Sequence, residues 1–248
     1  MEVDRLLEYK GDLPYTRGGK ERLSTQMNDL GKAFSSFFRD PAWFTKTLVA
    51  GLWMILSVFG IGILVLVGYF VQIAQRAMRR EDPVLPRWDG IGRKLALGFR
   101  FGVVYLVYLV PVLLLLFPVI FILVLTGGGE ETETLPIILS IYTFGVTLLL
   151  IPYGLCLSLV SPIILYRFAE RERIGDATDF VRVVRQFGNN WQNTLAVALI
   201  GIGIQSIAPV GIMVFGVGIV FTLFYSLVVT AHMSGLLGLD ALKREQTT

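Results

Sequence analysis

Histidine and cysteine are nearly missing from this chain of 248 residues, which has one of each, His232 and Cys156. A single cysteine cannot form an intramolecular disulfide, so cysteine usage indicates no redox compartment. The lone histidine has no second histidine or carboxylate at the spacing of a metal site. We therefore predict no metal and no cofactor, and we interpret His232 as a packed imidazole bonded to a carbonyl or hydroxyl group.

Charge is also scarce. Asp, Glu, Lys and Arg make up 17% of the residues, against about 25% in soluble domains. Four intervals contain none of them: residues 47–75, 101–129, 134–166 and 186–239. Each is longer than the roughly 20 apolar residues that cross a bilayer. Intramembrane chemistry usually shows itself as ionisable residues within spans, and these intervals contain only His232. The sequence therefore predicts an integral membrane protein that is not an enzyme.

The N-terminal residues 1–26 lack the apolar core of a signal peptide and mix charges with Gly and Pro. We expect neither a cleaved signal nor a transit sequence there, but a polar and flexible tail. The membrane domain is predicted over 27–239, followed by a cytosolic tail at 240–248.

The number of crossings follows from length and from the distribution of basic residues. As one helix, the interval 186–239 would be about 80 Å long, so it must cross twice, with a break near Pro209 and Gly211. The interval 47–75 could be one tilted helix or two short ones that turn at Phe59–Gly62. With a turn there, all 22 Lys and Arg residues fall on one side, as expected for cytoplasmic loops. A re-entrant hairpin gives the same sidedness.

Two segments of the chain look alike. Residues 27–39 and 176–188 have apolar side chains at helical spacing with basic residues opposite, which predicts amphipathic helices on the membrane surface. Each is followed by a tryptophan, Trp43 or Trp191, and then by an apolar pair of helices. We therefore predict a duplicated unit within an all-α, polytopic bundle of about six spans, both termini cytosolic. The predicted spans are 43–58, 61–79, 95–125, 135–168, 192–207 and 211–238.

Candidate site residues are few and are not catalytic. Basic residues near the predicted inner face are expected to contact anionic lipid headgroups: Arg79, Arg80, Arg93, Lys94, Arg182 and Arg185. Polar residues within the spans could line a cavity: Tyr105, Tyr108, Tyr142 and His232. Four prolines interrupt the two middle spans, and we favour packing curvature over a hinge or cavity as their role.

The stretch AMRREDPVLPRWDG, followed by YLVYLVP in the next span, resembles a prokaryotic membrane family known as domain of unknown function 4013. The resemblance extends over about 34–239. It rests on Gly68, Tyr69, Arg79, Arg80, Leu85 to Asp89, Tyr108 and Pro111, with Pro162, Tyr166, Asp176 and Phe180 later in the chain. It implies a prokaryotic plasma membrane and no known activity.

The sequence supports two hypotheses about function. The first is a scaffold, accessory subunit or lipid-organising protein, with anionic lipids, a membrane protein or a second copy of the chain as partners and no nucleic acid. The alternative is a carrier of lipid or of a small apolar solute, because duplicated helical pairs and broken helices are features of transporters. A cavity lined by the span tyrosines would favour the carrier.

Overall fold

The computed structural model describes residues 31–125, 134–207, 211 and 218–245. Regular structure in these residues is entirely helical, which confirms the all-α prediction. Residues 31–39 are helical, and the elements that follow are α3 (Trp43–Leu56), η2 (Ser57–Phe59), α4 (Ile61–Met78), α5 (Ile91–Leu125), α6 (Thr134–Arg171), α7 (Ile174–Thr178), α8 (Phe180–Asn189), α9 (Trp191–Ile207) and α10 (Gly218–Glu245). The predicted tail 1–26, the start of the helix at 27–39 and Pro209 lie outside the described residues.

The uncharged interval 47–75 turns back on itself. The α3 helix ends at Leu56, and η2 leads into Gly60, whose φ of 79° is left-handed. Glycine adopts this conformation without the steric cost that a Cβ atom brings. The Gly60 backbone N–H donates to the Ser57 carbonyl at 2.9 Å, and α4 starts at the next residue. The predicted turn is therefore present, and the interval is not a single rod.

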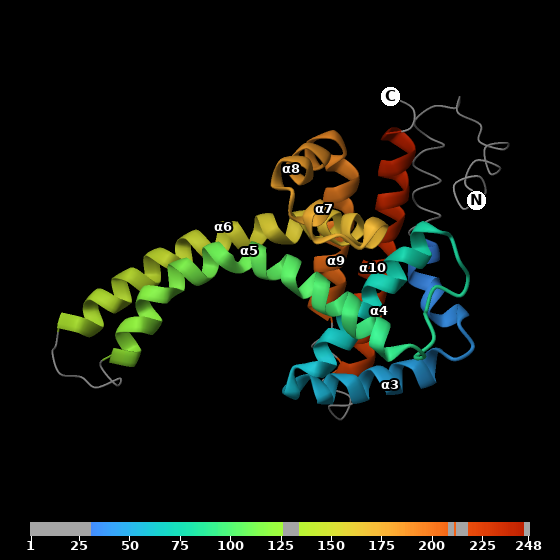
Figure 1. Ribbon diagram of the computed structural model, residues 1–248, viewed down its shortest axis with the longest axis horizontal. Helices are drawn as coiled ribbons and strands as arrows, with labels where there is room; N and C mark the ends of the chain where they lie inside the picture. Colours follow the sequence, from blue (N-terminus) through green and yellow to red (C-terminus); the bar gives the residue numbers. More distant parts are fainter. Residues whose placement is uncertain (1–30, 126–133, 208–210, 212–217, 246–248) are drawn as a thin grey trace.

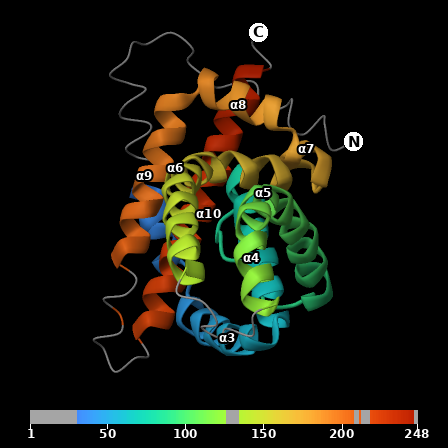
Figure 2. The same cartoon turned by 90° about the vertical axis from the view of Figure 1, so that its left-hand side faces the viewer.

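The predicted number of six spans is not confirmed. Four described helices are long and apolar enough to cross a membrane: Ile61–Met78, Ile91–Val124, Ile137–Arg171 and Gly218–Leu242. A fifth candidate is the pair Gly31–Arg39 and Trp43–Phe59, which is bent by 90° and would be a broken span or a re-entrant loop. In both views α3 lies across one end of the bundle, below α4 and α10 (Figures 1 and 2). With 14 residues, α3 is shorter than a full span.

The α4 helix is the centre of the packing. A Cβ atom added at Gly98 of α5 would lie 1.7 Å from the Leu64 carbonyl oxygen, and one at Gly68 would lie 1.8 Å from that of Lys94. The two backbones therefore meet directly, as small residues allow in membrane helices. On its other side α4 packs against α10, where a Cβ at Gly235 would lie 2.4 Å from the Ala74 carbonyl oxygen.

The α5 and α6 helices form an apolar arm, running side by side away from the other helices (Figure 1). Tyrosines of α6 tie it together: the Tyr142 hydroxyl donates to the Leu115 carbonyl at 2.8 Å, and the Tyr153 hydroxyl donates to the Tyr108 carbonyl. Each accepting carbonyl lies three residues before a proline, Pro118 or Pro111. A proline removes the helical hydrogen bond to the carbonyl four residues before it, so each tyrosine bonds to the carbonyl that follows the one left without its donor, at Leu114 or Val107. The role of the four span prolines in packing curvature stays a prediction.

The predicted surface helix 176–188 is wrong as a single helix. It is divided into α7 and α8 at Asp179, whose carboxylate accepts a hydrogen bond from the Arg182 backbone N–H at 3.1 Å. Asp179 is thus the N-cap of α8, and its non-helical backbone (φ −73°, ψ 88°) ends α7. The helix pairs α3–α4 and α9–α10 both begin at a tryptophan. Most of the α9–α10 connection lies outside the described residues, so the duplication stays a prediction.

Candidate functional site

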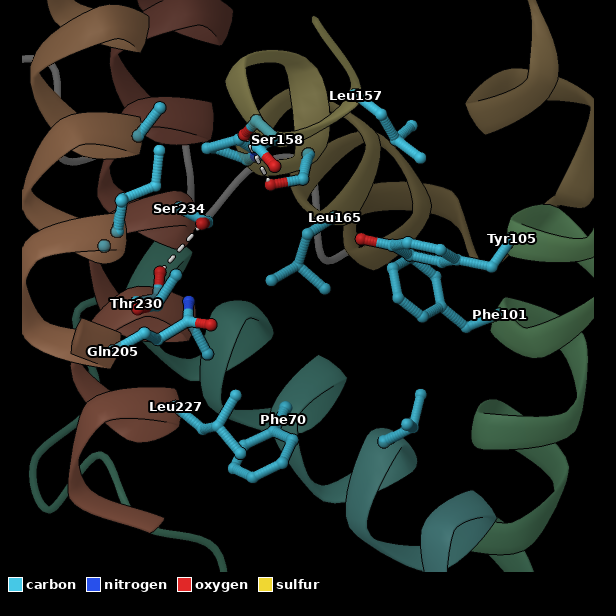
Figure 3. Close-up of a pocket in the computed structure, with 17 residues that line it drawn as sticks. Phe70, Phe101, Tyr105, Leu157, Ser158, Leu165, Gln205, Leu227, Thr230 and Ser234 are labelled. Atoms are coloured by element: carbon cyan, nitrogen blue, oxygen red, sulfur yellow. Dashed lines mark hydrogen bonds between the residues drawn. The ribbon is translucent and has the colours of Figure 1, made fainter. Parts of the chain in front are cut away.

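A cavity of about 370 Å³ lies among α4, α5, α6, α9 and α10 (Figure 3). Its apolar walls include Val67, Phe70, Leu157, Leu165 and Leu227. Its polar lining consists of Tyr105, Ser158, Ser161, Gln205, Thr230 and Ser234. The volume is near the lower end of the roughly 300–1,000 Å³ typical of small-molecule sites. None of the lining residues carries a formal charge.

Three hydroxyl groups of the lining are bonded to the backbone of their own helix. Ser161 Oγ donates to the Ser158 carbonyl at 2.9 Å on α6. On α10, Thr230 Oγ1 donates to the Ser226 carbonyl at 2.8 Å and Ser234 Oγ donates to the Thr230 carbonyl at 2.7 Å. Each hydroxyl oxygen keeps lone pairs that can accept a further hydrogen bond. These groups therefore offer acceptors to the cavity with their single hydrogens already engaged.

Three other polar groups of the lining have no hydrogen-bond partner among the described residues: the Tyr105 hydroxyl, the Ser158 hydroxyl and the Gln205 amide. Figure 3 shows the ends of Tyr105 and Gln205 pointing into the cavity from opposite sides. Tyr105 comes from α5 and Gln205 from α9. Together they provide at least three N–H and O–H donors.

The other residues predicted to line a cavity lie elsewhere and serve in packing. Tyr108 is buried and donates to the Ala177 carbonyl at 2.8 Å, while its ring packs edge-on against Phe180. Tyr142 belongs to the α5–α6 arm. His232 is buried with its Nδ1 atom 2.8 Å from the Ser36 hydroxyl, as its interpretation as a packed imidazole requires.

The predicted headgroup contacts fall into three groups. Arg79, Arg93 and Arg182 are exposed but lie within ion-pair distance of Glu81 (3.8 Å), Glu172 (3.3 Å) and Asp179 (2.9 Å) respectively. Arg80 and Arg185 are exposed, and no described carboxylate pairs with them. The predicted headgroup contact of Lys94 does not fit the structure. The residue is 2% exposed and its ammonium group donates to the Asp89 carbonyl, so its side chain faces the protein.

The comparison with protein families finds one match, to residues 49–230, described as a protein of unknown function, DUF4013. The chain belongs to this family. The match confirms the resemblance noted in the sequence and includes every residue of the cavity lining except Ala231 and Ser234. No curated protein and no solved structure matches the chain. Over the ranges that the structure describes, no three His, Cys, Asp or Glu residues gather where they could hold a metal ion.

Of the polar residues that line the cavity, the sequence interpretation named Tyr105 and missed Ser161, Gln205, Thr230 and Ser234. The sequence contained a pattern that indicates the polar face of α10 in the cavity. Hydroxyl residues recur every fourth position along this helix, at Thr222, Ser226, Thr230 and Ser234, and four-residue spacing places them on one face. Gln205 had the simplest signal of all, because it is an amide within an interval that is otherwise mostly apolar.

Proposed function

We propose that this protein is an integral membrane protein that binds a small apolar or amphiphilic molecule between its helices and carries it within the bilayer. The cavity among α4, α5, α6, α9 and α10 is the observation on which the proposal rests. It is bordered by the four helices that could cross a membrane, together with α9. A ligand that partitions into lipid would reach such a site sideways from the bilayer. The protein would lie in a prokaryotic plasma membrane with both termini cytosolic.

The chemistry of the lining supports binding rather than reaction. Among its described residues there is no carboxylate, amine, guanidinium, imidazole or thiol, and these are the usual groups for acid–base and nucleophilic catalysis. The serine and threonine hydroxyls have no base beside them in the cavity. Apolar walls with a few polar groups are typical of sites that hold small molecules.

The proposal is tested by filling the cavity. Leu157 lines it and is half-buried, whereas Leu155 lies on the exposed side of α6 outside it. The Leu157→Trp variant should lose molecules that co-purify with the wild-type protein in mild detergent, as measured by mass spectrometry of organic extracts. Leu155→Trp should retain them. If neither variant changes the extracts, or if the wild-type protein carries nothing beyond the bulk lipids, carriage through this cavity is ruled out.

A second candidate function is that of a scaffold or accessory subunit, favoured by the α5–α6 arm. Leu114, Phe117, Val124, Ile141 and Phe144 are all exposed on it. An apolar surface of this extent is covered by lipid or by another membrane protein. A photocrosslinking amino acid at Leu114, which is 69% exposed, should yield one discrete protein adduct if a partner docks there. The same probe at buried Leu97 is the control, and adducts with lipid alone would reject docking at the arm.

Anionic lipids are the partner that we propose for the charged side of the molecule. The α8 helix exposes Phe180, Val181 and Val184 together with Arg185, and this combination suits a helix lying in the headgroup region. Arg80 and Arg185 have no described carboxylate partner, so their charge is available to phosphate. The double variant Arg80→Gln with Arg185→Gln should retain less anionic lipid after purification than Arg79→Gln, since Arg79 already faces Glu81. Equal retention would contradict the assignment.

A further inference from the structure

The three unpartnered polar groups of the cavity lie far along their helices from the charged connectors. Tyr105 is 14 residues after the start of α5 at Ile91, and Gln205 is 14 residues after Trp191 at the start of α9. Ser158 is 13 residues before the end of α6 at Arg171. At about 1.5 Å per residue, each lies about 20 Å from that end of its helix, and Gln205 is two residues from the other end of α9 at Ile207. All three belong to intervals without a formal charge, in which the sequence predicts membrane spans.

Ser158 and Gln205 are exposed and Tyr105 is half-buried. Within a membrane span such polar groups are costly without partners, because hydrocarbon offers nothing in exchange for the hydrogen bonds to water. Three groups from three different helices open into the same cavity, where the Ser161, Thr230 and Ser234 oxygens can still accept hydrogen bonds. A ligand with its own hydrogen-bond donor and acceptor could pair with the unpartnered groups and also with these three oxygens. A charged ligand would not fit, because the lining holds no countercharge and burying an unpaired ion is far more costly than burying a neutral polar group.

We propose that the cavity binds an uncharged, single-chain amphiphile, of the long-chain alcohol or monoacylglycerol class, whose hydroxyl or carbonyl group is held by Tyr105, Ser158 and Gln205. The chain of the ligand lies along the apolar wall formed by Phe70, Leu165 and Leu227. A cavity of about 370 Å³ has room for a small head group and part of one chain, and not for a two-chain phospholipid. This inference rests on the proposed function and specifies its ligand.

The test uses the full chain in lipid nanodiscs and three photoreactive probes with the same hydrocarbon chain: a monoacylglycerol, a fatty acid and an alkane without a head group. We expect the monoacylglycerol to label peptides of the cavity lining most strongly. In the double variant Tyr105→Phe with Gln205→Leu, its apparent affinity should fall by about tenfold or more, while labelling by the alkane is unchanged. Each lost hydrogen bond contributes a factor of about two to ten.

A control variant removes two polar groups, a tyrosine hydroxyl and a serine hydroxyl, that lie outside the cavity lining. Tyr225→Phe with Ser206→Ala deletes hydroxyls that bond to the Phe34 and Ile202 carbonyls, and it should leave labelling by the monoacylglycerol as in the wild type. If the double variant of the cavity does not purify as a single species, Tyr105→Phe alone carries the test, because it removes one oxygen atom from a half-buried ring.

The outcomes separate the inference from the proposed function. Equal labelling by the monoacylglycerol and the alkane, or no effect of the double variant, would show that the cavity takes apolar molecules without hydrogen bonding. The ligand class would then be wrong and the carrier function would stand. Preference for the fatty acid would overturn the uncharged ligand in the same way. Labelling of the cavity by none of the probes would contradict the inference and the proposed function together.

Discussion

Replacing Gly98 with alanine should separate α4 from α5 and destabilise the whole bundle. The new Cβ atom would lie 1.7 Å from the Leu64 carbonyl oxygen, which is backbone and cannot rotate away. Restoring a contact of 3.0–3.4 Å requires a shift of about 1.3–1.7 Å between the helices. Gaps of 0.5–1 Å already forfeit about a quarter to a half of the dispersion energy of neighbouring contacts. We therefore expect a loss near the upper end of overpacking effects, about 3 kcal/mol.

The matched control is Gly102→Ala, one turn further along the same helix. Its Cβ would lie 3.8 Å from the nearest atom, a Leu64 methyl group, so this substitution adds ordinary contact and should be neutral or slightly stabilising. Unfolding of both variants in mixed micelles, driven by increasing SDS and followed by tryptophan fluorescence, gives the midpoints to compare. Equal midpoints for Gly98→Ala and Gly102→Ala would refute the direct backbone contact between α4 and α5.

Three further predictions use other contacts. Tyr142→Phe removes one hydrogen bond of the α5–α6 arm and should cost about 0.5–1.5 kcal/mol in the same assay; no change would mean that the bond does not hold the arm together. Asp40→Ala leaves the Lys46 ammonium without its buried partner at 2.5 Å and should cost about 3–5 kcal/mol; a loss below 1 kcal/mol would contradict the contribution of this pair. Val58→Cys, on a Cys156→Ala background, should react with an impermeant maleimide from outside intact cells, because Val58 is 86% exposed beside the turn; labelling only after permeabilisation would contradict the predicted sidedness.

Charge distribution predicted the turn at Gly60 because basic residues are costly to move through lipid. That argument needs no knowledge of packing, since it compares only which connectors share a side. The break between α7 and α8 escaped the same sequence interpretation. Asp179 lies within a continuous helical pattern, and its role as the N-cap depends on a backbone conformation that the pattern does not contain.

The close approach of α4 and α5 had a signal that was not used. The stretch GFRFG, from Gly98 to Gly102, has the four-residue glycine spacing that permits backbones to meet. Even so, the sequence could not tell which glycine makes the contact. A Cβ atom at Gly98 would collide with the backbone of α4, whereas one at Gly102 would make only an ordinary contact with a Leu64 methyl group. That difference depends on the position and angle at which two helices cross, and both are set by every side chain of the interface.

Lys94 illustrates the same limit for charge. A lysine beside Arg93 at the start of a span was expected to contact headgroups, as basic residues near membrane surfaces do. Instead, the tight contact of Gly68 with the Lys94 backbone places this side chain against protein, where its ammonium group donates a hydrogen bond to the Asp89 carbonyl. Its neighbour Arg93 points outward to Glu172. Adjacent side chains on a helix point in directions about 100° apart, so one can face solvent while the next faces the protein interior.

The two proposed functions make opposite demands on α6, and the helix is therefore the best place to separate them. Leu157, Ser158 and Ser161 line the cavity, while Leu148 and Leu155 are exposed outside it. A carrier needs the first face open and can tolerate bulk on the second. A scaffold needs the second face complementary to a partner and can tolerate a filled cavity. If Leu157→Trp removes bound molecules and Leu155→Trp removes only a protein adduct, then one helix serves both roles through different faces.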